Sequence, residues 1–158
     1  MGSATGRSGQ RPRPTLLYLM KQVETAVRSE LDDITRPVGL TALQYTALTV
    51  LEQHPDLTVA RLARHSFTRA QSAADMVAAL LNRGLVERHR DPADRRRLVM
   101  ALTPDGQRLL DQLRPQVAEI EGRMLAPLSP EDARELRSSL ELCREALSAS
   151  SEAAVLQK

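Results

Sequence analysis

Aromatic side chains are scarce in this chain: they make up 2% of its 158 residues, and tryptophan is absent. Hydrophobic residues nevertheless reach 42%, which is enough to form a core. Such a core must be built mainly from Leu, Val and Ala, a set of side chains that favours helices packed on helices over a β-sandwich. The length suits one domain, or one domain with an added oligomerisation part.

Cysteine and long apolar runs are also scarce. The single cysteine, Cys143, excludes an internal disulfide framework and any metal site with several cysteine ligands. It falls on the apolar face of a predicted helix, where we expect a small packing residue rather than a reactive thiol. The chain shows no secretory leader pattern and no apolar run long enough to span a bilayer. We therefore expect a soluble, cytoplasmic protein without a membrane partner.

Lysine is the third rarity, because Lys21 and Lys158 are the only lysines among 22 basic residues. The net charge is only +2, but the isoelectric point is about 9.1 and the arginines are clustered. The clustering says more about a partner than the net charge does, because a basic patch is the electrostatic footprint of nucleic-acid binding.

No arrangement of residues predicts catalysis. His54, His65 and His89 are scattered, without the His-Glu-x-x-His spacing of a zinc enzyme, and no glycine-rich loop follows a strand. We therefore predict that the protein is not an enzyme and has neither a metal site nor a cofactor. A metal-sensing alternative requires these histidines to converge with carboxylates in the fold.

Residues 58–84 have the pattern of two helices joined by a turn at Ser66-Phe67, where Phe67 is expected to be buried. In the second helix the small and aliphatic residues recur at helical spacing, which predicts one buried face: Ala70, Ala73, Ala74, Val77, Leu80 and Leu81. Thr68 with Gln71 has the pattern of a capping box, and Gly84 is the expected left-handed stop.

Three polar residues near the start of this second helix lie off its buried face: Arg69, Gln71 and Ser72. Their side chains can present a bidentate donor fork and an amide to base edges in a major groove.

After Gly84 the hydrophobic period changes from helical to alternating, so residues 85–90 and 98–103 are predicted to form a strand pair. The loop between them holds the densest positive charge in the chain, Arg95, Arg96 and Arg97, directly after Asp94. The planar fork of arginine suits phosphate and narrow minor grooves. Taken alone, the loop could be a solvated hairpin tip; beside the two helices it completes one connected basic surface.

Amphipathic helices are predicted on both sides of this region, over residues 15–36 and 104–147, with Pro115 expected to kink the second segment. Their apolar stripes are larger than the two central helices and the strand pair can cover, so we predict that a second copy of the chain covers them. Residues 1–14 are expected to form a disordered arm and residues 148–158 a frayed tail.

Several of these motifs, in this order, resemble the MarR family of winged-helix transcriptional regulators. They are the wing Asp91-Pro92-Ala93-Asp94-Arg95-Arg96, the strand after it, and Leu102-Thr103-Pro104-Asp105-Gly106. The resemblance extends from about residue 15 to 147. It implies a mainly α (α+β) fold in which a winged helix-turn-helix lobe, residues 38–103, joins a helical dimerisation lobe built from the N- and C-terminal helices. In the family pattern a small polar cap stands at the position of Arg69. Either Thr68 caps an earlier helix start, or the first turn is irregular.

The resemblance implies a dimeric, sequence-specific regulator of double-stranded DNA, a repressor that binds a pseudo-palindromic operator and is released by a small apolar or aromatic effector. It matches Arg96 to a minor-groove arginine and Asp94 to the residue that orients it. Tyr18 and Tyr45 are candidates to line a ligand cleft, although both could be core residues. The alternatives are a winged-helix protein-interaction module and a constitutive DNA binder without ligand sensing.

Overall fold

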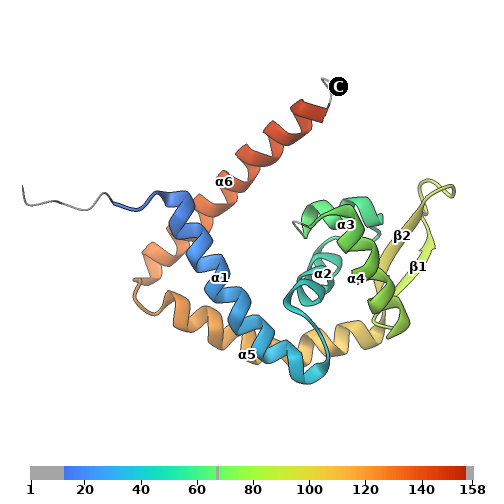
Figure 1. The fold of residues 1–158 in the computed structure, drawn as a ribbon, viewed down its shortest axis with the longest axis horizontal. Helices are drawn as coiled ribbons and strands as arrows, with labels where there is room; N and C mark the ends of the chain where they lie inside the picture. Colours follow the sequence, from blue (N-terminus) through green and yellow to red (C-terminus); the bar gives the residue numbers. More distant parts are fainter. Residues whose placement is uncertain (1–12, 67, 156–158) are drawn as a thin grey trace, which may run out of the picture. The chain divides into compact units, whose positions relative to one another are not determined.

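The computed structural model describes residues 13–66 and 68–155, and Figure 1 traces them. The elements in chain order are α1 (Leu16–Thr35), the short 3-10 helix η1 (Arg36–Val38), α2 (Ala42–Gln53), α3 (Val59–His65), α4 (Ala70–Asn82), β1 (Val86–Arg90), β2 (Leu98–Leu102), α5 (Pro104–Leu125) and α6 (Pro130–Val155). The two strands form one antiparallel sheet. This arrangement confirms the predicted mainly helical fold. The predicted arm, up to residue 12, and Phe67 lie outside the described residues.

Apart from α4, the α-helices begin where the sequence places a threonine or serine cap. Thr41 Oγ1 accepts the Gln44 N–H at 3.1 Å, while Gln44 Oε1 accepts the Thr41 N–H at 3.0 Å, which closes the predicted capping box of α2. The hydroxyls of Thr58, Thr103 and Ser129 likewise accept a backbone N–H in the first turns of α3, α5 and α6. Each cap satisfies a helix-end donor that has no partner inside the helix.

The chain divides into two compact units, Met1–Arg114 and Pro115–Lys158, so the division falls inside α5. The first unit contains α1 to α4, the strand pair and the beginning of α5. Its core is aliphatic, as the composition predicts, and its fully buried side chains include Leu48, Leu51, Leu62, Val77, Leu80, Val99, Met100 and Leu110. This core holds the helix-turn-helix and the strand pair on one scaffold.

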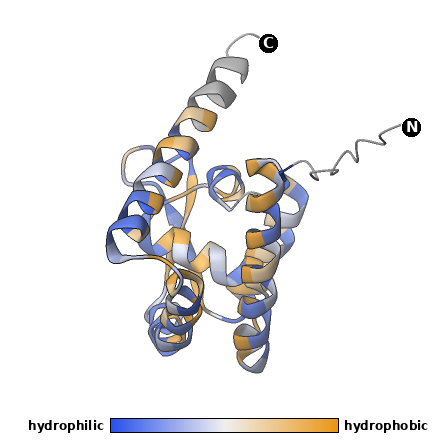
Figure 2. Ribbon diagram, turned by 90° about the vertical axis from the view of Figure 1, so that its left-hand side faces the viewer, coloured by the Kyte–Doolittle hydropathy of each residue, from blue (hydrophilic) through white to orange (hydrophobic). Residues whose placement is uncertain are grey.

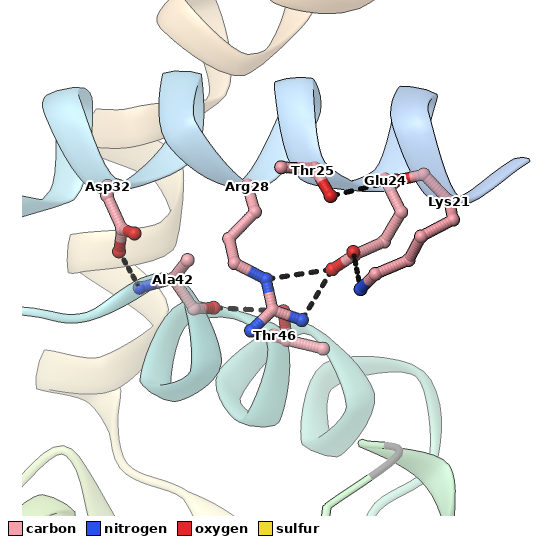
Figure 3. Close-up of polar contacts among 7 residues, drawn as sticks. All are labelled: Lys21, Glu24, Thr25, Arg28, Asp32, Ala42 and Thr46. Carbon is pink, nitrogen blue, oxygen red and sulfur yellow. Dashed lines mark hydrogen bonds and ion pairs between the residues drawn. The ribbon is translucent and has the colours of Figure 1, made fainter. Parts of the chain in front are cut away.

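A tight corner joins α1 to α2. The Leu40 N–H donates to the carbonyl of the buried Thr35 at 3.0 Å, and Gly39 adopts a left-handed conformation with φ of 71°. Figure 3 shows Asp32 of α1 reaching the first turn of α2, where its Oδ1 accepts the Ala42 N–H at 2.9 Å. The orientation of α2 is therefore tied to the end of α1.

The first half of α1 exposes apolar side chains: Leu16, Leu17, Leu19, Met20 and Val23. Its polar side is organised by Glu24, which accepts Lys21 Nζ and Arg28 Nε, each at 2.8 Å (Figure 3). These contacts with Lys21 and Arg28 lower the pKa of Glu24.

The second unit is a hairpin of the end of α5 and α6, in which Arg137 pairs with Glu121 at 2.8 Å. A groove of about 290 Å³ lies between the two helices, with Met124, Leu125 and Leu136 in its lining. In Figure 2, orange segments alternate with blue ones along the helix that leads to the C-terminus, and four leucines of that helix are exposed: Leu136, Leu140, Leu142 and Leu147.

α6 carries Cys143 and extends into the predicted C-terminal tail. Cys143 is exposed, so it does not pack inside the single chain as expected. Its neighbours Leu140, Leu142 and Leu147 on α6 are exposed as well. The helix continues to Val155, into the segment that was expected to fray, and residues 156–158 lie outside the described ones. Across the described parts of the chain, no helix combines the length and apolarity needed to cross a membrane.

Candidate nucleic-acid interface

The helix-turn-helix consists of α3 and α4, which both pack on the core of the first unit. α3 buries Leu62 and Ala63. α4 buries residues at the i, i+3, i+4 and i+7 spacing of a single helical face: Ala73, Met76, Val77 and Leu80. The opposite face of α4 is left free for contact with a partner.

This buried face differs from the predicted one. Ala70 and Ala74 are exposed, whereas Met76 is 5% exposed and belongs to the core. Ala70 is the first residue of α4. Met76 was not among the residues predicted to be buried, but it is longer and more adaptable than an alanine, so it fills core space that a methyl group leaves empty. The prediction from the run of alanines therefore placed the centre of the buried face of α4 wrongly.

The start of α4 also differs from prediction. Its N-cap residue is Arg69, which makes no side-chain capping bond. Thr68 belongs to the preceding turn, where its N–H donates to the Ala63 carbonyl at 3.0 Å. The capping box of Thr68 with Gln71 is therefore wrong, because Thr68 stands one residue too early. At the other end, Gly84 has φ of 66°, which confirms the predicted left-handed stop.

The predicted base-contacting residues are all exposed at the beginning of α4: Arg69, Gln71 and Ser72. Gln71 Nε2 donates to Asp75 Oδ1 across one turn at 3.5 Å, the long limit for such a bond. This contact is weak enough to be exchanged for a base edge. Since α4 has no side-chain cap, its first backbone N–H groups are also available to an acceptor.

The wing tip is shaped by Asp94, whose Oδ1 accepts the backbone N–H of Arg96 at 3.1 Å. Its carbonyl accepts the Arg97 N–H at 2.9 Å, and the Asp91 N–H donates to the Arg97 carbonyl at 3.0 Å. Asp94 thus acts on Arg96 through the backbone. The side chains of Arg95, Arg96 and Arg97 are exposed, and among the residues that the structure describes they form no ion pair.

The base of the wing is fastened to the loop between α2 and α3. His89 of β1 contacts Asp56 Oδ1 through Nε2 at 2.7 Å and the Arg90 carbonyl through Nδ1 at 3.0 Å. Both partners are acceptors, so both ring nitrogens donate and the imidazolium form fits best. The contact with the Arg90 carbonyl raises the pKa of His89 most, burial opposes that rise, and the Asp56 carboxylate adds to it. Leu57 and Met100 form an additional β-bridge at this point.

A polar cluster that the sequence reasoning missed connects α2 to the beginning of α5. Glu52 accepts Gln107 Nε2 at 2.6 Å and pairs with Arg114, whose Nε also donates to Asp111 at 2.9 Å. Arg114 first, and Gln107 next, lower the pKa of Asp111. The helical spacing of Gln107, Asp111 and Arg114 could have indicated a shared face, but only the fold brings Glu52 to it.

The two tyrosines have different environments. Tyr18 is 56% exposed on the first half of α1, whereas Tyr45 of α2 is partly buried against the core. Burial raises the pKa of Tyr45, Arg114 lowers it to a smaller extent, and Glu52 adds to the rise. Tyr45 therefore stays a neutral hydroxyl near the polar cluster.

The histidines converge only in part. The rings of His54 and His65 lie 5.0 Å apart between centroids, while His89 is engaged with Asp56 at the wing. Within residues 13–66 and 68–155, no group of three or more His, Cys, Asp or Glu residues could hold a metal ion. The metal-sensing alternative gains no support from this arrangement.

Sequence comparison gives this geometry a context. A family model described as the MarR family matches residues 38–97. The HTH-type transcriptional repressor Rv2887 of Mycobacterium tuberculosis is 32% identical over 124 residues, 78% of this chain and 89% of that protein. The transcriptional regulator HosA of Escherichia coli is 31% identical over 117 residues, 74% of this chain and 82% of that protein.

Two solved structures have a similar fold. The Mycobacterium tuberculosis MarR family protein Rv2887, in complex with p-aminosalicylic acid, has 30% sequence identity and a TM-score of 0.68, over 82% of this chain and 98% of that one. CouR from Rhodococcus jostii, bound to p-coumaroyl-CoA, has 25% identity and a TM-score of 0.71, over 80% of this chain and 89% of that one. The proteins similar to this chain are thus transcription regulators, not enzymes.

Proposed function

The chain belongs to the MarR family of transcriptional regulators, and on that premise we propose that it is a dimeric, sequence-specific repressor released from DNA by a small apolar or aromatic ligand. One observation carries the DNA-binding part: the polar start of α4 and the arginines of the wing are all exposed on elements fixed to one buried core. A rigid scaffold is required for base readout, because hydrogen-bond geometry must be reproduced at each site.

On DNA, α4 lies in the major groove. Gln71 is the leading base reader, since its amide can form two bonds with the edge of adenine, and Ser72 and Arg69 flank it. The uncapped N–H groups at the start of α4 bind a phosphate, as helix N-termini do. The two kinds of contact have different roles: the phosphate contacts set the register of the protein on the DNA, and Gln71 recognises the base sequence.

The wing supplies the second set of contacts. Arg96 enters the minor groove, while Arg95 and Arg97 bind phosphates on either side. Asp94 supports Arg96 by holding the turn, as its bond to the Arg96 N–H indicates. Fastening of β1 by His89 to Asp56 keeps the wing at a constant position relative to α4.

The dimer is supported by the apolar side chains that the single chain leaves exposed on α1 and on α6. A second copy covers them, and two recognition helices about 34 Å apart then read a pseudo-palindrome. Sedimentation at micromolar concentration is expected to give a dimer, and deletion of residues 129–158 is expected to abolish both dimerisation and operator binding. A stable monomer that binds the operator normally contradicts this assembly.

We propose that a ligand cleft lies between α1, α2 and the beginning of α5, with Tyr18 and Tyr45 as hydroxyl donors. Aromatic compounds are the preferred class, because one relative has been crystallised with p-aminosalicylic acid, an aromatic acid, and another with p-coumaroyl-CoA, an aromatic thioester. A ligand that lowers DNA affinity tenfold must bind the DNA-free protein tenfold more tightly than the DNA-bound protein, which corresponds to a coupling free energy of about 1.4 kcal/mol.

The experiment selects an operator from random duplexes and measures its affinity by fluorescence anisotropy over a range of salt concentrations. We expect affinity to fall as salt rises, and the operator to be preferred over random duplex. A panel of aromatic acids and phenols is then titrated into the complex. Tyr45→Phe, which removes only the hydroxyl, is expected to weaken the ligand response and retain DNA affinity. A chain that shows no operator preference is instead a protein-interaction module; one that no ligand releases is a constitutive DNA binder.

A further inference from the structure

Arg83, the C-cap residue of α4, forms the longest-range side-chain contact of the recognition helix. Its Nη1 donates to the Gly39 carbonyl at 2.6 Å and its Nη2 donates to the Val38 carbonyl at 2.8 Å. The two nitrogens of one planar fork thus hold two successive carbonyl groups. A positive charge at this position also suits the negative end of the α4 dipole.

The acceptors of Arg83 belong to the corner between α1 and α2. Val38 ends η1, and Gly39 turns the chain with φ of 71°. A side chain at Gly39 would start 3.5 Å from Arg83 Nη1, so the guanidinium lies directly against the glycine backbone. The neighbouring contact between Asp32 and the Ala42 N–H joins this corner to α1 and α2. Arg83 therefore connects α4 to the end of α1.

The next residue makes a second connection. The Gly84 carbonyl accepts the hydroxyl of Thr103 at 2.6 Å, and Thr103 is the residue that caps α5. The end of α4 is thus attached through successive residues to the segment that follows α1 and to the segment that begins α5. Both α1 and α5 are helices that we assign to the dimer and the ligand cleft.

We propose that Arg83 is a positioning residue for DNA recognition, whose paired bonds to Val38 and Gly39 set the orientation of α4 relative to the end of α1. This inference rests on the proposed function, because it takes α4 to be the element that reads DNA. Sequence discrimination then depends on Arg83 even though Arg83 contacts no base. Affinity for random DNA, which comes from attraction to phosphate, depends on Arg83 only through its single positive charge.

Three variants separate geometry from charge. Arg83→Ala removes both bonds, whereas Arg83→Lys keeps the charge but replaces the planar fork with a single ammonium. Arg36→Ala is the matched control: Arg36 starts η1, is exposed, and forms only a 3.4 Å pair with Asp33 three residues away. It removes one positive charge from the same corner without touching α4.

The first readout needs no DNA. Amide NMR spectra of the free protein are expected to show exchange broadening along α4 in Arg83→Ala, from motion on the μs–ms timescale, and sharp parent-like signals in Arg36→Ala. The parent should also show separate, slowly rotating guanidinium signals for Arg83. Parent-like α4 signals in Arg83→Ala overturn the inference, whatever the protein binds.

The second readout is the ratio of operator affinity to random-duplex affinity, measured well below the melting temperature of each variant. Arg83→Ala is expected to lower this ratio about three- to tenfold, as the loss of charge-assisted hydrogen bonds at an exposed site would. Arg83→Lys should lie close to Arg83→Ala, and Arg36→Ala close to the parent. Equal losses on both duplexes, or full rescue by lysine, mean that Arg83 contributes only charge and refute the proposal. A parent protein without operator preference refutes the proposed function instead, and the NMR result then decides on Arg83 alone.

Discussion

Substitution of Gly106 tests the packing that joins the wing to α5. Gly106 lies in the first turn of α5, and an ideal Cβ built on it would stand 2.1 Å from the Leu85 carbonyl oxygen at the beginning of the wing. Real Cβ atoms essentially never approach another heavy atom within 3.0 Å. In Gly106→Ala the backbone of α5 or of Leu85 must therefore retreat by roughly 1 Å.

The expected cost follows from the contacts near this point. Overpacking against a fixed backbone costs about 1–3 kcal/mol. The retreat also stretches the bond from the Thr103 N–H to the Leu85 carbonyl, 3.1 Å long, and a weakened hydrogen bond adds about 0.5–1.5 kcal/mol. Alanine stabilises the helix by at most about 1 kcal/mol relative to glycine, because its helix propensity is higher. The net expectation is a destabilisation of about 0.5–3.5 kcal/mol.

The same helix offers the control. Gly122 also lies in α5, and no atom lies within 4 Å of the Cβ that an alanine would add. Gly122→Ala should therefore raise the free energy of unfolding by about 0.5–1 kcal/mol. The same Gly→Ala substitution is thus expected to lower the free energy of unfolding at Gly106 and to raise it at Gly122.

Urea unfolding followed by circular dichroism measures both effects. All variants are compared at one protomer concentration, because dimerisation contributes to the apparent stability. A lower midpoint with an unchanged slope is expected for Gly106→Ala. If Gly106→Ala is as stable as the parent or more stable, the close approach of α5 to Leu85 is wrong. Equal destabilisation at both glycines would show that contact with Leu85 is not the cause.

The remaining predictions concern DNA binding and pH. Arg96→Ala should weaken operator binding by about 1–3 kcal/mol in anisotropy titrations, and parent-like affinity would contradict a minor-groove role. Arg95→Ala should mainly reduce the steepness of the plot of log affinity against log salt concentration by about one unit. An unchanged slope means that Arg95 binds no phosphate. Gln71→Ala should lower operator affinity more than random-duplex affinity; equal losses would assign Gln71 to the backbone. The raised pKa of His89 contributes stability that is complete below its unfolded value of 6.5 and is lost as pH rises through the folded pKa. Asp56→Asn, which tolerates the left-handed φ of 63° at this position, should reduce that pH dependence of the urea midpoint, and an unchanged profile would exclude the contact as its source.

Features that depend on a few neighbouring residues could be read from the sequence. The capping box of Thr41 with Gln44 and the stop at Gly84 are determined within one turn of helix, where the partners are adjacent in the chain. The alternating pattern on either side of the wing likewise predicted a strand pair, because hydrophobic period reports secondary structure directly. The position of Arg69, Gln71 and Ser72 off the predicted buried face supplied the candidate base readers, and the family resemblance supplied the roles of Arg96 and Asp94.

Other features depend on which distant segments meet, and local patterns carry no record of that. The face that α4 buries was decided by core space that Met76 fills better than alanine does. The partners of Arg83 lie 44 and 45 residues away, and Glu52 meets Arg114 across 62 residues. Such contacts form only after the core has brought their helices together, because an exposed polar pair is too weak to organise a chain. Sequence therefore determined the elements, and tertiary packing decided which polar groups connect them.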